Sequence, residues 1–221
     1  MEERYIRNLG ALTEEECLAL RGKKVFVAGC GGLGGHIIDM LLRVGIGSIS
    51  VADGDVFDES NLNRQLLSRT DVLGHSKAEV AALHAAAVNP DVCFTVKAEF
   101  VTQDNVTELL SGCDAVMDAL DNIPSRKLIK AECDRQGIPY IYGAITGWTA
   151  QAAVSLPGDG LLDLLYPTDN VSVSKSSLSP TPALCAAMQT ALCIRLLCGR
   201  DVEAGKLYYF DLLDMEFESL F

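Results

Sequence analysis

Short apolar runs alternate with helical patterns over roughly the first two thirds of the chain. Runs rich in β-branched residues predict strands, and apolar positions at helical spacing predict helices between them. The expected strands are 25–29, 48–53, 93–100, 114–120 and 139–145, and the expected helices are 36–45, 77–88, 105–112 and 125–137. Strands that alternate with helices in this way indicate a parallel sheet with helices on both faces.

The pattern changes after about residue 148. Residues 149–156 predict a strand with no helix after it, and 157–181 are rich in Pro, Gly, Ser, Thr and Asp, which favours a long surface loop. A strongly apolar helix is expected at 182–199, and one or two antiparallel strands at 206–220. We therefore expect an α/β, Rossmann-like fold with a mainly parallel sheet that is extended by antiparallel C-terminal strands.

Charge and cysteine spacing narrow the function classes. The net charge of −12 argues against a nucleic-acid partner, which would need a basic surface. The first 20 residues are charged without the apolar core of a signal peptide, and no apolar run reaches transmembrane length. We therefore expect a cytoplasmic protein with no membrane partner. The eight cysteines include no C-x-x-C pair, which favours buried, reduced thiols over disulfides or zinc.

The stretch GCGGLGG at 29–35 follows the first expected strand and has the spacing G-x-G-x-x-G. Glycines allow a tight turn there, and the helix that begins near Leu33 offers backbone N–H groups to a phosphate. A turn that merely needs small residues is the alternative, but the position between strand and helix favours nucleotide binding. Asp53 ends the second expected strand, where an acid accepts hydrogen bonds from ribose hydroxyls. These features suit NAD and ATP equally.

The polar stretch DGDVFDESNLNRQ at 53–65 favours ATP. Arg64 can bind phosphate oxygens with its planar fork, and Lys77 at a helix start can add a second cation, although both are also compatible with ordinary solvated residues. Asp121 follows the fourth expected strand, where a carboxylate can hold Mg²⁺, or can cap the 125–137 helix instead. No histidine is expected to act as a base, because His36, His75 and His84 fall in helices or turns.

These motifs in this order resemble the ubiquitin-activating-enzyme-like adenylyltransferases, the HesA/MoeB/ThiF group. The matching pieces are ERYIRN at 3–8, GCGGLG, DGD…SNLNRQ, SK, ALDN…R, Pro180 and Gln189. The resemblance implies ATP-dependent adenylation of the C-terminal Gly-Gly carboxylate of a ubiquitin-like sulfur-carrier protein, with release of pyrophosphate. It also implies a thiamin- or molybdopterin-type pathway. The chain is most similar in character to a short ThiF-type protein without zinc cysteines.

The resemblance also assigns roles to residues of this chain. It implies a phosphate loop, a ribose acid, triphosphate contacts, supporting polar residues and a magnesium ligand. These are Gly29, Gly31, Gly32 and Gly34 for the loop, Asp53 for the ribose, Arg64 and Lys77 for the triphosphate, Asn61, Gln65 and Asp55 around the cofactor, and Asp121 for Mg²⁺. Arg7 resembles an arginine that reaches the triphosphate of a neighbouring subunit, which implies a homodimer.

One domain is expected over 1–221. It would comprise an N-terminal helical segment at 1–22, a nucleotide-binding core at 23–147, and a carrier-binding part at 148–221 that contains the 157–181 crossover loop.

The sequence differs from many members of the group at two sets of cysteines. The chain lacks the two C-x-x-C pairs of many members, so we expect no zinc. It also has no cysteine between residues 133 and 185, and Cys185 falls within an expected helix, so we expect an enzyme that stops at the acyl-adenylate. Three alternatives stay open. They are an ATP-dependent enzyme acting on a modified tRNA nucleoside or a small carboxylate, a non-catalytic partner subunit, and an NAD-dependent dehydrogenase.

Overall fold

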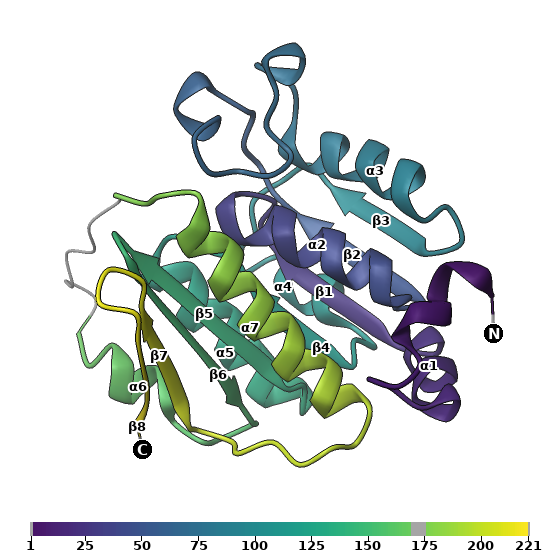
Figure 1. Ribbon diagram of the computed structural model, residues 1–221. Coiled ribbons are helices and arrows are strands. Elements are labelled where there is room, and N and C mark those ends of the chain that lie inside the picture. Colours follow the sequence, from purple (N-terminus) through teal and green to yellow (C-terminus); the bar gives the residue numbers. More distant parts are fainter. Residues whose placement is uncertain (1, 169–175, 221) are drawn as a thin grey trace.

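The computed structural model describes residues 2–168 and 176–220, and its centre is one sheet in the order β3-β2-β1-β4-β5-β6-β7-β8 (Figure 1). The strands are β1 (Lys24–Ala28), β2 (Ser48–Ala52), β3 (Cys93–Lys97), β4 (Ala115–Asp118), β5 (Tyr140–Thr146), β6 (Thr149–Ser155), β7 (Leu207–Asp211) and β8 (Glu216–Leu220). The strands from β3 to β5 pair in parallel, and those from β5 to β8 pair antiparallel. The expected fold class is therefore confirmed.

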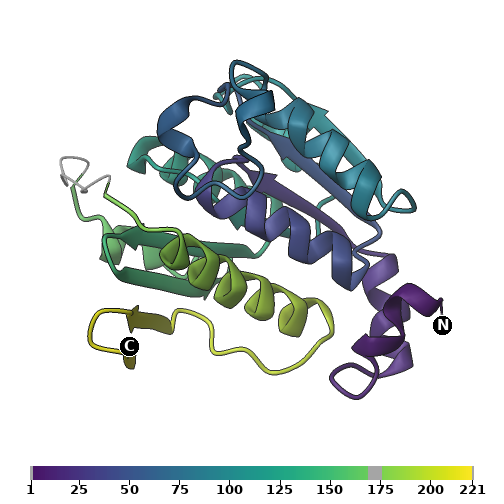
Figure 2. The same cartoon turned by 45° about the horizontal axis from the view of Figure 1, so that its top comes forward.

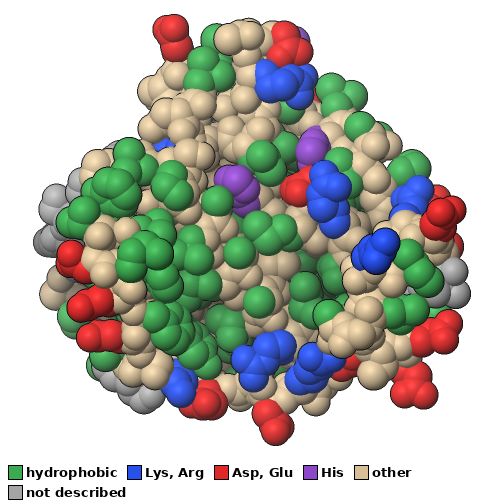
Figure 3. All heavy atoms as spheres, in the orientation of Figure 1, with side chains coloured by type: hydrophobic (Ala, Val, Ile, Leu, Met, Phe, Trp, Pro, Cys, Tyr) green, Lys and Arg blue, Asp and Glu red, His purple; other side chains and the backbone are tan. Residues whose placement is uncertain are grey.

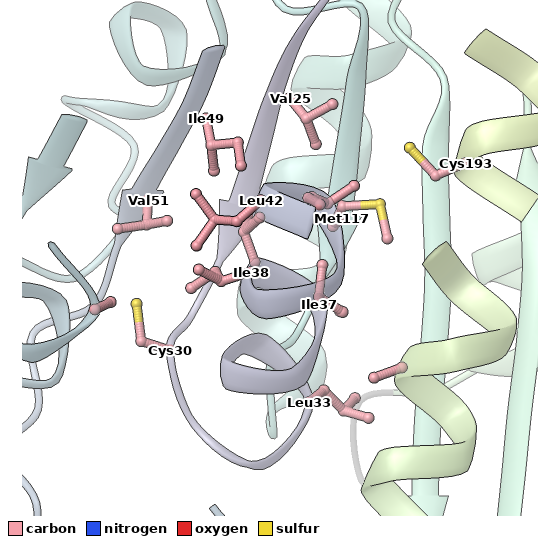
Figure 4. Close-up of a cluster of buried hydrophobic side chains, with 14 of the residues drawn as sticks. Val25, Cys30, Leu33, Ile37, Ile38, Leu42, Ile49, Val51, Met117 and Cys193 are labelled. Carbon is pink, nitrogen blue, oxygen red and sulfur yellow. The ribbon is translucent and has the colours of Figure 1, made fainter. Parts of the chain in front are cut away.

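Helices cover both faces of the parallel part (Figure 2). One face carries α2 (Gly32–Val44), α3 (Lys77–Val88) and α7 (Pro180–Leu197), and the other carries α4 (Val106–Leu110) and α5 (Ile123–Gln136). Side chains of β1 alternate between the two cores, with Val25 and Val27 facing one and Phe26 the other. Figure 4 shows the first core, in which Ile38 and Leu42 of α2 pack beside Ile49 of β2. This two-sided burial explains the uninterrupted apolar runs of the central strands.

The N-terminal segment packs at the carboxyl end of α2. It consists of the 3₁₀ helix η1 (Glu3–Asn8) and α1 (Glu14–Arg21). The Asn8 amide donates to the carbonyl of Val44 at 3.2 Å, and Tyr5 lies against Gly45, whose φ of +91° ends the helix. A side chain at Gly45 would meet the Tyr5 ring at 2.7 Å, so glycine is needed there.

Three element predictions need correction. The expected loop at 157–181 contains a short helix, α6 (Leu161–Leu165), since Leu161 and Leu162 find a buried site against the second core. The expected strand at 93–100 ends at Lys97, where its pairing with β2 stops. The helix expected at 125–137 begins at Ile123, because Asn122 caps it. Positions 169–175 of the expected loop lie outside the described residues.

The order of the parallel strands changes direction at β1. The chain passes from β1 through β2 to β3 at one edge, and then returns to β4 on the other side of β1. The carboxyl ends of β1 and β4 therefore face a crevice, which is where ligands bind in open α/β sheets. No helix in the described ranges is long and apolar enough to cross a membrane.

Candidate active site

The glycine loop lies at the carboxyl end of β1, and its geometry depends on two glycines. Gly29 has a φ of +103°, and a Cβ at Gly34 would lie 1.9 Å from the carbonyl oxygen of Gly29. The loop therefore folds tightly onto the start of α2. Gly31 is the N-cap of α2 and provides no side-chain cap, which leaves N–H groups of the first turn for an anion.

Asp53 follows β2, and its carboxylate binds the backbone of the glycine loop. Its carboxylate accepts hydrogen bonds from the N–H groups of Cys30 at 2.7 Å and Asp55 at 2.8 Å. Burial raises the pKa of the Asp53 carboxyl, and these two donors oppose that shift. Asp53 thus shapes the loop as well as lining the pocket above it.

Lys77 and Asp55 form an ion pair at the pocket wall. The Lys77 ammonium lies 3.1 Å from a carboxylate oxygen of Asp55, and the Lys77 side chain is only 9% exposed. The Lys77 N–H also donates to the carbonyl of Asp55 at 3.0 Å, so the two residues are tied at both backbone and side chain. Asp55 therefore holds the amino group of Lys77 toward the pocket that both residues line.

Arg64 and Gln65 come from the segment after the 3₁₀ helix η2 (Glu59–Asn61). The Arg64 guanidinium donates to the carbonyl of Ser60 at 2.8 Å and the amide oxygen of Asn63 at 2.9 Å, and no carboxylate within the described residues pairs with it. Gln65 is buried, and its Oε1 has no hydrogen-bond partner among those same residues. Both side chains line the pocket, and both retain capacity to bind a ligand.

Asn61 lies behind this wall rather than on it. Its amide exchanges hydrogen bonds with Asp58, donating to the carboxylate at 3.1 Å and accepting from the N–H at 3.2 Å. The structure therefore gives Asn61 a role in shaping the segment that carries Arg64.

Asp121 lies in the turn between β4 and α5 and lines the same pocket as the glycine loop. The alternative role of helix cap belongs to Asn122, whose side chain accepts from the N–H of Ser125 at 2.9 Å. Asp121 is thus placed at the carboxyl ends of the strands, on the same side of the sheet as Asp53.

Several residues that line the pocket were not predicted from the sequence. Arg126 is 5% exposed and donates at 2.6 Å to Asp118, a carboxylate with no exposed surface. The other members come from distant segments and are mainly apolar, and they include Phe100, Val101, Ile145 and Tyr166. Arg126 does occur in the ALDN…R motif, which was the one available signal.

The pocket combines an apolar wall with three cationic and three acidic side chains, and Arg64 is the cation that has no carboxylate partner among the described residues. Such a combination suits a ligand that has a polyanionic part and a flat apolar part. A second groove continues from it and shares Arg64, Ser176 and Ser177. Trp148, the single tryptophan, lines this groove beyond Arg64.

Arg7 lies outside the pocket. It belongs to η1, which is anchored by Asn8 to the last residue of α2, whereas the glycine loop precedes the first. The 13 residues of α2 separate the two ends by roughly 20 Å at 1.5 Å per residue. Within one copy, Arg7 therefore does not belong to the site.

The pocket suits magnesium better as a companion of a ligand than as a resident ion. No group of three or more His, Cys, Asp or Glu side chains suited to a metal occurs in residues 2–168 and 176–220. Mg²⁺ is usually held by one or two carboxylates together with substrate phosphates. Asp121, which lines the same pocket as Arg64 and Lys77, fits that arrangement, whereas the absence of zinc stays a prediction.

The sequence and the fold match those of known proteins. The model of the ThiF family matches residues 4–220. The SAMP-activating enzyme E1 of Haloferax volcanii is 35% identical over 208 residues, which cover 91% of this chain and 77% of that protein. The sulfur carrier protein ThiS adenylyltransferase of Bacillus subtilis is 32% identical over 83% of this chain and 57% of its own length.

Solved structures agree on the fold. A crystal structure of Escherichia coli MccB with MccA-N7isoASN superposes with a TM-score of 0.85 at 22% identity, covering 100% of this chain and 71% of that one. The predicted family and the predicted adenylyltransferase class are confirmed by the family match and the named relatives. The chain belongs to the ThiF family.

Proposed function

We propose that this chain uses ATP and Mg²⁺ to adenylate the C-terminal Gly-Gly carboxylate of a ubiquitin-like sulfur-carrier protein, releasing pyrophosphate. The observation that carries the proposal is the pocket itself, in which Arg64 and Lys77 meet the glycine loop and Asp121. An arginine that has no carboxylate partner among the described residues, together with Lys77, matches a triphosphate better than the pyrophosphate of a dinucleotide. The names of the two most informative relatives, a SAMP-activating enzyme and a ThiS adenylyltransferase, support this type of partner.

The chemistry asks little of the protein beyond position and charge. The carrier carboxylate is already ionised at neutral pH, so it attacks the α-phosphorus without a general base. N–H groups of the glycine loop and Lys77 would hold the phosphates, and Arg64 would stabilise charge on the departing pyrophosphate. Asp121 would hold Mg²⁺, which supplies charge neutralisation when bound. Asp53 would accept hydrogen bonds from the ribose.

The second groove offers the carrier tail a route to the phosphates. It opens past Gly147 and Trp148 and joins the main pocket at Arg64. Because Gly147 has no side chain, it leaves the groove wide at that point. This suits an extended tail that ends in two glycines. A carrier tail lying there would bring its carboxylate to the side of the pocket where Arg64 lies.

We also propose a homodimer in which each copy provides Arg7 to the site of the other. Because η1 is anchored far from the glycine loop, an Arg7 that takes part in the reaction would do so in the site of a neighbouring copy. Figure 3 shows hydrophobic side chains gathered on the face beside α7 where β7 and β8 lie, and Leu213, Met215 and Phe217 there are exposed. Figures 1 and 2 place this face at the other end of the molecule from η1, so it is not by itself the interface that would exchange Arg7.

Mixing two inactive variants tests the shared site. Arg7→Ala and Arg64→Ala are each expected to lose carrier-dependent ATP–pyrophosphate exchange. After unfolding and joint refolding, mixed dimers should regain activity, because one of their two sites then has both arginines. A mixture as inactive as its parents would contradict the exchange of Arg7 between copies.

Cys185 is expected to form no bond with the carrier. Its side chain has no exposed surface, and burial raises the pKa of its thiol to about 12, so it stays protonated at neutral pH. We therefore expect Cys185→Ala to keep full ATP–pyrophosphate exchange. Intact-mass measurement after incubation with carrier, ATP and Mg²⁺ should show no covalent conjugate. A conjugate that the Cys185→Ala variant lacks would overturn the expectation.

Nucleotide binding separates this proposal from a dehydrogenase or a non-catalytic subunit. We expect ATP with Mg²⁺ to raise the Tm of the protein and NAD⁺ to leave it unchanged. Incubation with a Gly-Gly carrier and hydroxylamine should then give a carrier hydroxamate, because hydroxylamine traps an acyl-adenylate. A Tm raised by NAD⁺ alone would point to a dehydrogenase, and ATP binding without any hydroxamate would point to another substrate or to a non-catalytic subunit. The cytoplasmic location stays a prediction from sequence.

A further inference from the structure

The hydrogen-bonded ladder between β4 and β5 is short and ends before the carboxyl ends of the two strands. Their ladder pairs Val116 with Tyr140 and Met117 with Ile141 and then ends. Strand β5 continues to Thr146, but from Tyr142 onward its ladder within the described residues is with β6, on its other side. Backbone groups at the end of β4 would lie buried without partners unless side chains replaced the missing ladder.

Two buried side chains fill this gap. Gln189 of α7 donates through Nε2 to the carbonyl of Asp118 at 2.7 Å and to that of Ile141 at 3.0 Å, so it bridges the two strands. A Cβ at Gly143 would lie 2.1 Å from the Gln189 side chain, which explains a glycine in the middle of β5. Arg126 of α5 donates to the carbonyl of Gly143 at 2.8 Å and so ties the same stretch of β5 from the other face.

Arg126 and Asp118 together hold one peptide segment, that of Leu120. One oxygen of Asp118 accepts from the Leu120 N–H at 3.1 Å, and the other pairs with Arg126 at 2.6 Å. The second nitrogen of Arg126 donates to the Leu120 carbonyl at 2.5 Å. Both backbone polar groups of the residue before Asp121 are therefore bound by a single buried ion pair.

We propose that Arg126 is a positioning residue for the adenylation reaction: by fixing Leu120 between β4 and β5, it sets the place of the Asp121 carboxylate that would hold Mg²⁺. The inference rests on the proposed function for the role of Asp121. Arg126 acts through the backbone, and its guanidinium is occupied by Asp118, Leu120 and Gly143. A lysine has one nitrogen and no planar fork, so it cannot reach all three acceptors at once.

The same helix provides a matched control. Lys130 lies one turn further along α5, is equally buried at 5% exposed, and pairs with Asp134 and Asp159. It does not line the pocket. Lys130→Met therefore removes a buried cation of α5 without changing the contacts of Leu120. A loss of stability that Lys130→Met shares with Arg126→Lys is then a general effect of altering a buried cation of this helix.

The first measurement uses the nucleotide-free protein and needs no activity. Hydrogen exchange of backbone amides in residues 119–122 should be about 10-fold faster in Arg126→Lys than in wild type, and unchanged in Lys130→Met. Equal exchange in Arg126→Lys and wild type would overturn the positioning role. Should Arg126→Lys fail to fold, Asp118→Asn, which keeps the size of the side chain, should show the same change to a smaller extent.

The second measurement concerns magnesium. Isothermal titration calorimetry of ATP binding should show that Arg126→Lys keeps wild-type affinity in EDTA but needs about 10-fold more Mg²⁺ for the metal-dependent gain, as when a group that orients a metal ligand is lost. Unaltered Mg²⁺ dependence, with or without faster exchange, would overturn the proposal. Failure of the wild-type chain to bind ATP at all would instead overturn the proposed function, and the exchange measurement would still report on Arg126.

Discussion

Arg64→Ala is expected to lower carrier-dependent ATP–pyrophosphate exchange by about 10³-fold, as for other arginines that neutralise a transferring phosphoryl group. Among the described residues, the guanidinium donates to a backbone carbonyl and a side-chain amide and to no carboxylate, so its positive charge is available to a triphosphate. The groove that would carry the carrier tail also meets the main pocket at this residue. Exchange measured at saturating ATP and carrier checks the result.

Arg69→Ala is the matched control. Arg69 follows in the same connecting segment, is 59% exposed and pairs with Asp71 at 2.9 Å, but it does not line the pocket. We expect this variant to keep exchange within about 2-fold of wild type, because exposed ion pairs contribute little. Similar losses in both variants would show that the effect of Arg64→Ala is general to the segment, and would remove Arg64 from the reaction.

Gly34→Ala is expected to have the largest effect on the fold. The added Cβ would lie 1.9 Å from the carbonyl oxygen of Gly29, and backbone on both sides leaves no flexible atom to move. We expect a loss of about 3 kcal/mol in the free energy of unfolding. This corresponds to a Tm lower by roughly 10 °C for a chain of this size. Thermal unfolding with and without ATP should also show that the variant no longer gains stability from the nucleotide.

Gly32→Ala provides the comparison within the same loop. Its nearest neighbour would be Pro182 at 3.7 Å, an ordinary contact, and the position is the first of α2. Alanine favours helix over glycine by up to about 1 kcal/mol, so the Tm should hold or rise slightly. A Gly34→Ala protein as stable as Gly32→Ala would contradict the tight fold of the loop.

The parts of the site that the sequence predicts are those made by short segments. The glycine loop and Asp53 each follow a strand directly, so their place at the carboxyl edge follows from the α/β pattern. The fold class was predictable for the same reason, because apolar runs of five residues with helices between them leave few other arrangements.

Long-range pairings account for what the sequence did not predict. Arg126 enters the site through Asp118 and two carbonyls, one of them 17 residues away on β5. Gln189 lies 71 residues from the carbonyl it binds. Asp55 was predicted to contact the cofactor, but the structure also pairs it with Lys77. The helix α6 was missed because its five residues are flanked by Gly160 and a polar stretch that favours a loop.

Carrier-dependent ATP–pyrophosphate exchange tests the central claim most directly. The wild-type protein is mixed with labelled pyrophosphate, ATP, Mg²⁺ and a panel of small ubiquitin-like carriers that end in Gly-Gly, each paired with a version that lacks these two residues. We predict that label enters ATP with at least one intact carrier and with none of the truncated ones. Exchange that proceeds without a carrier, or equally well with the truncated carriers, would contradict adenylation of a Gly-Gly carboxylate.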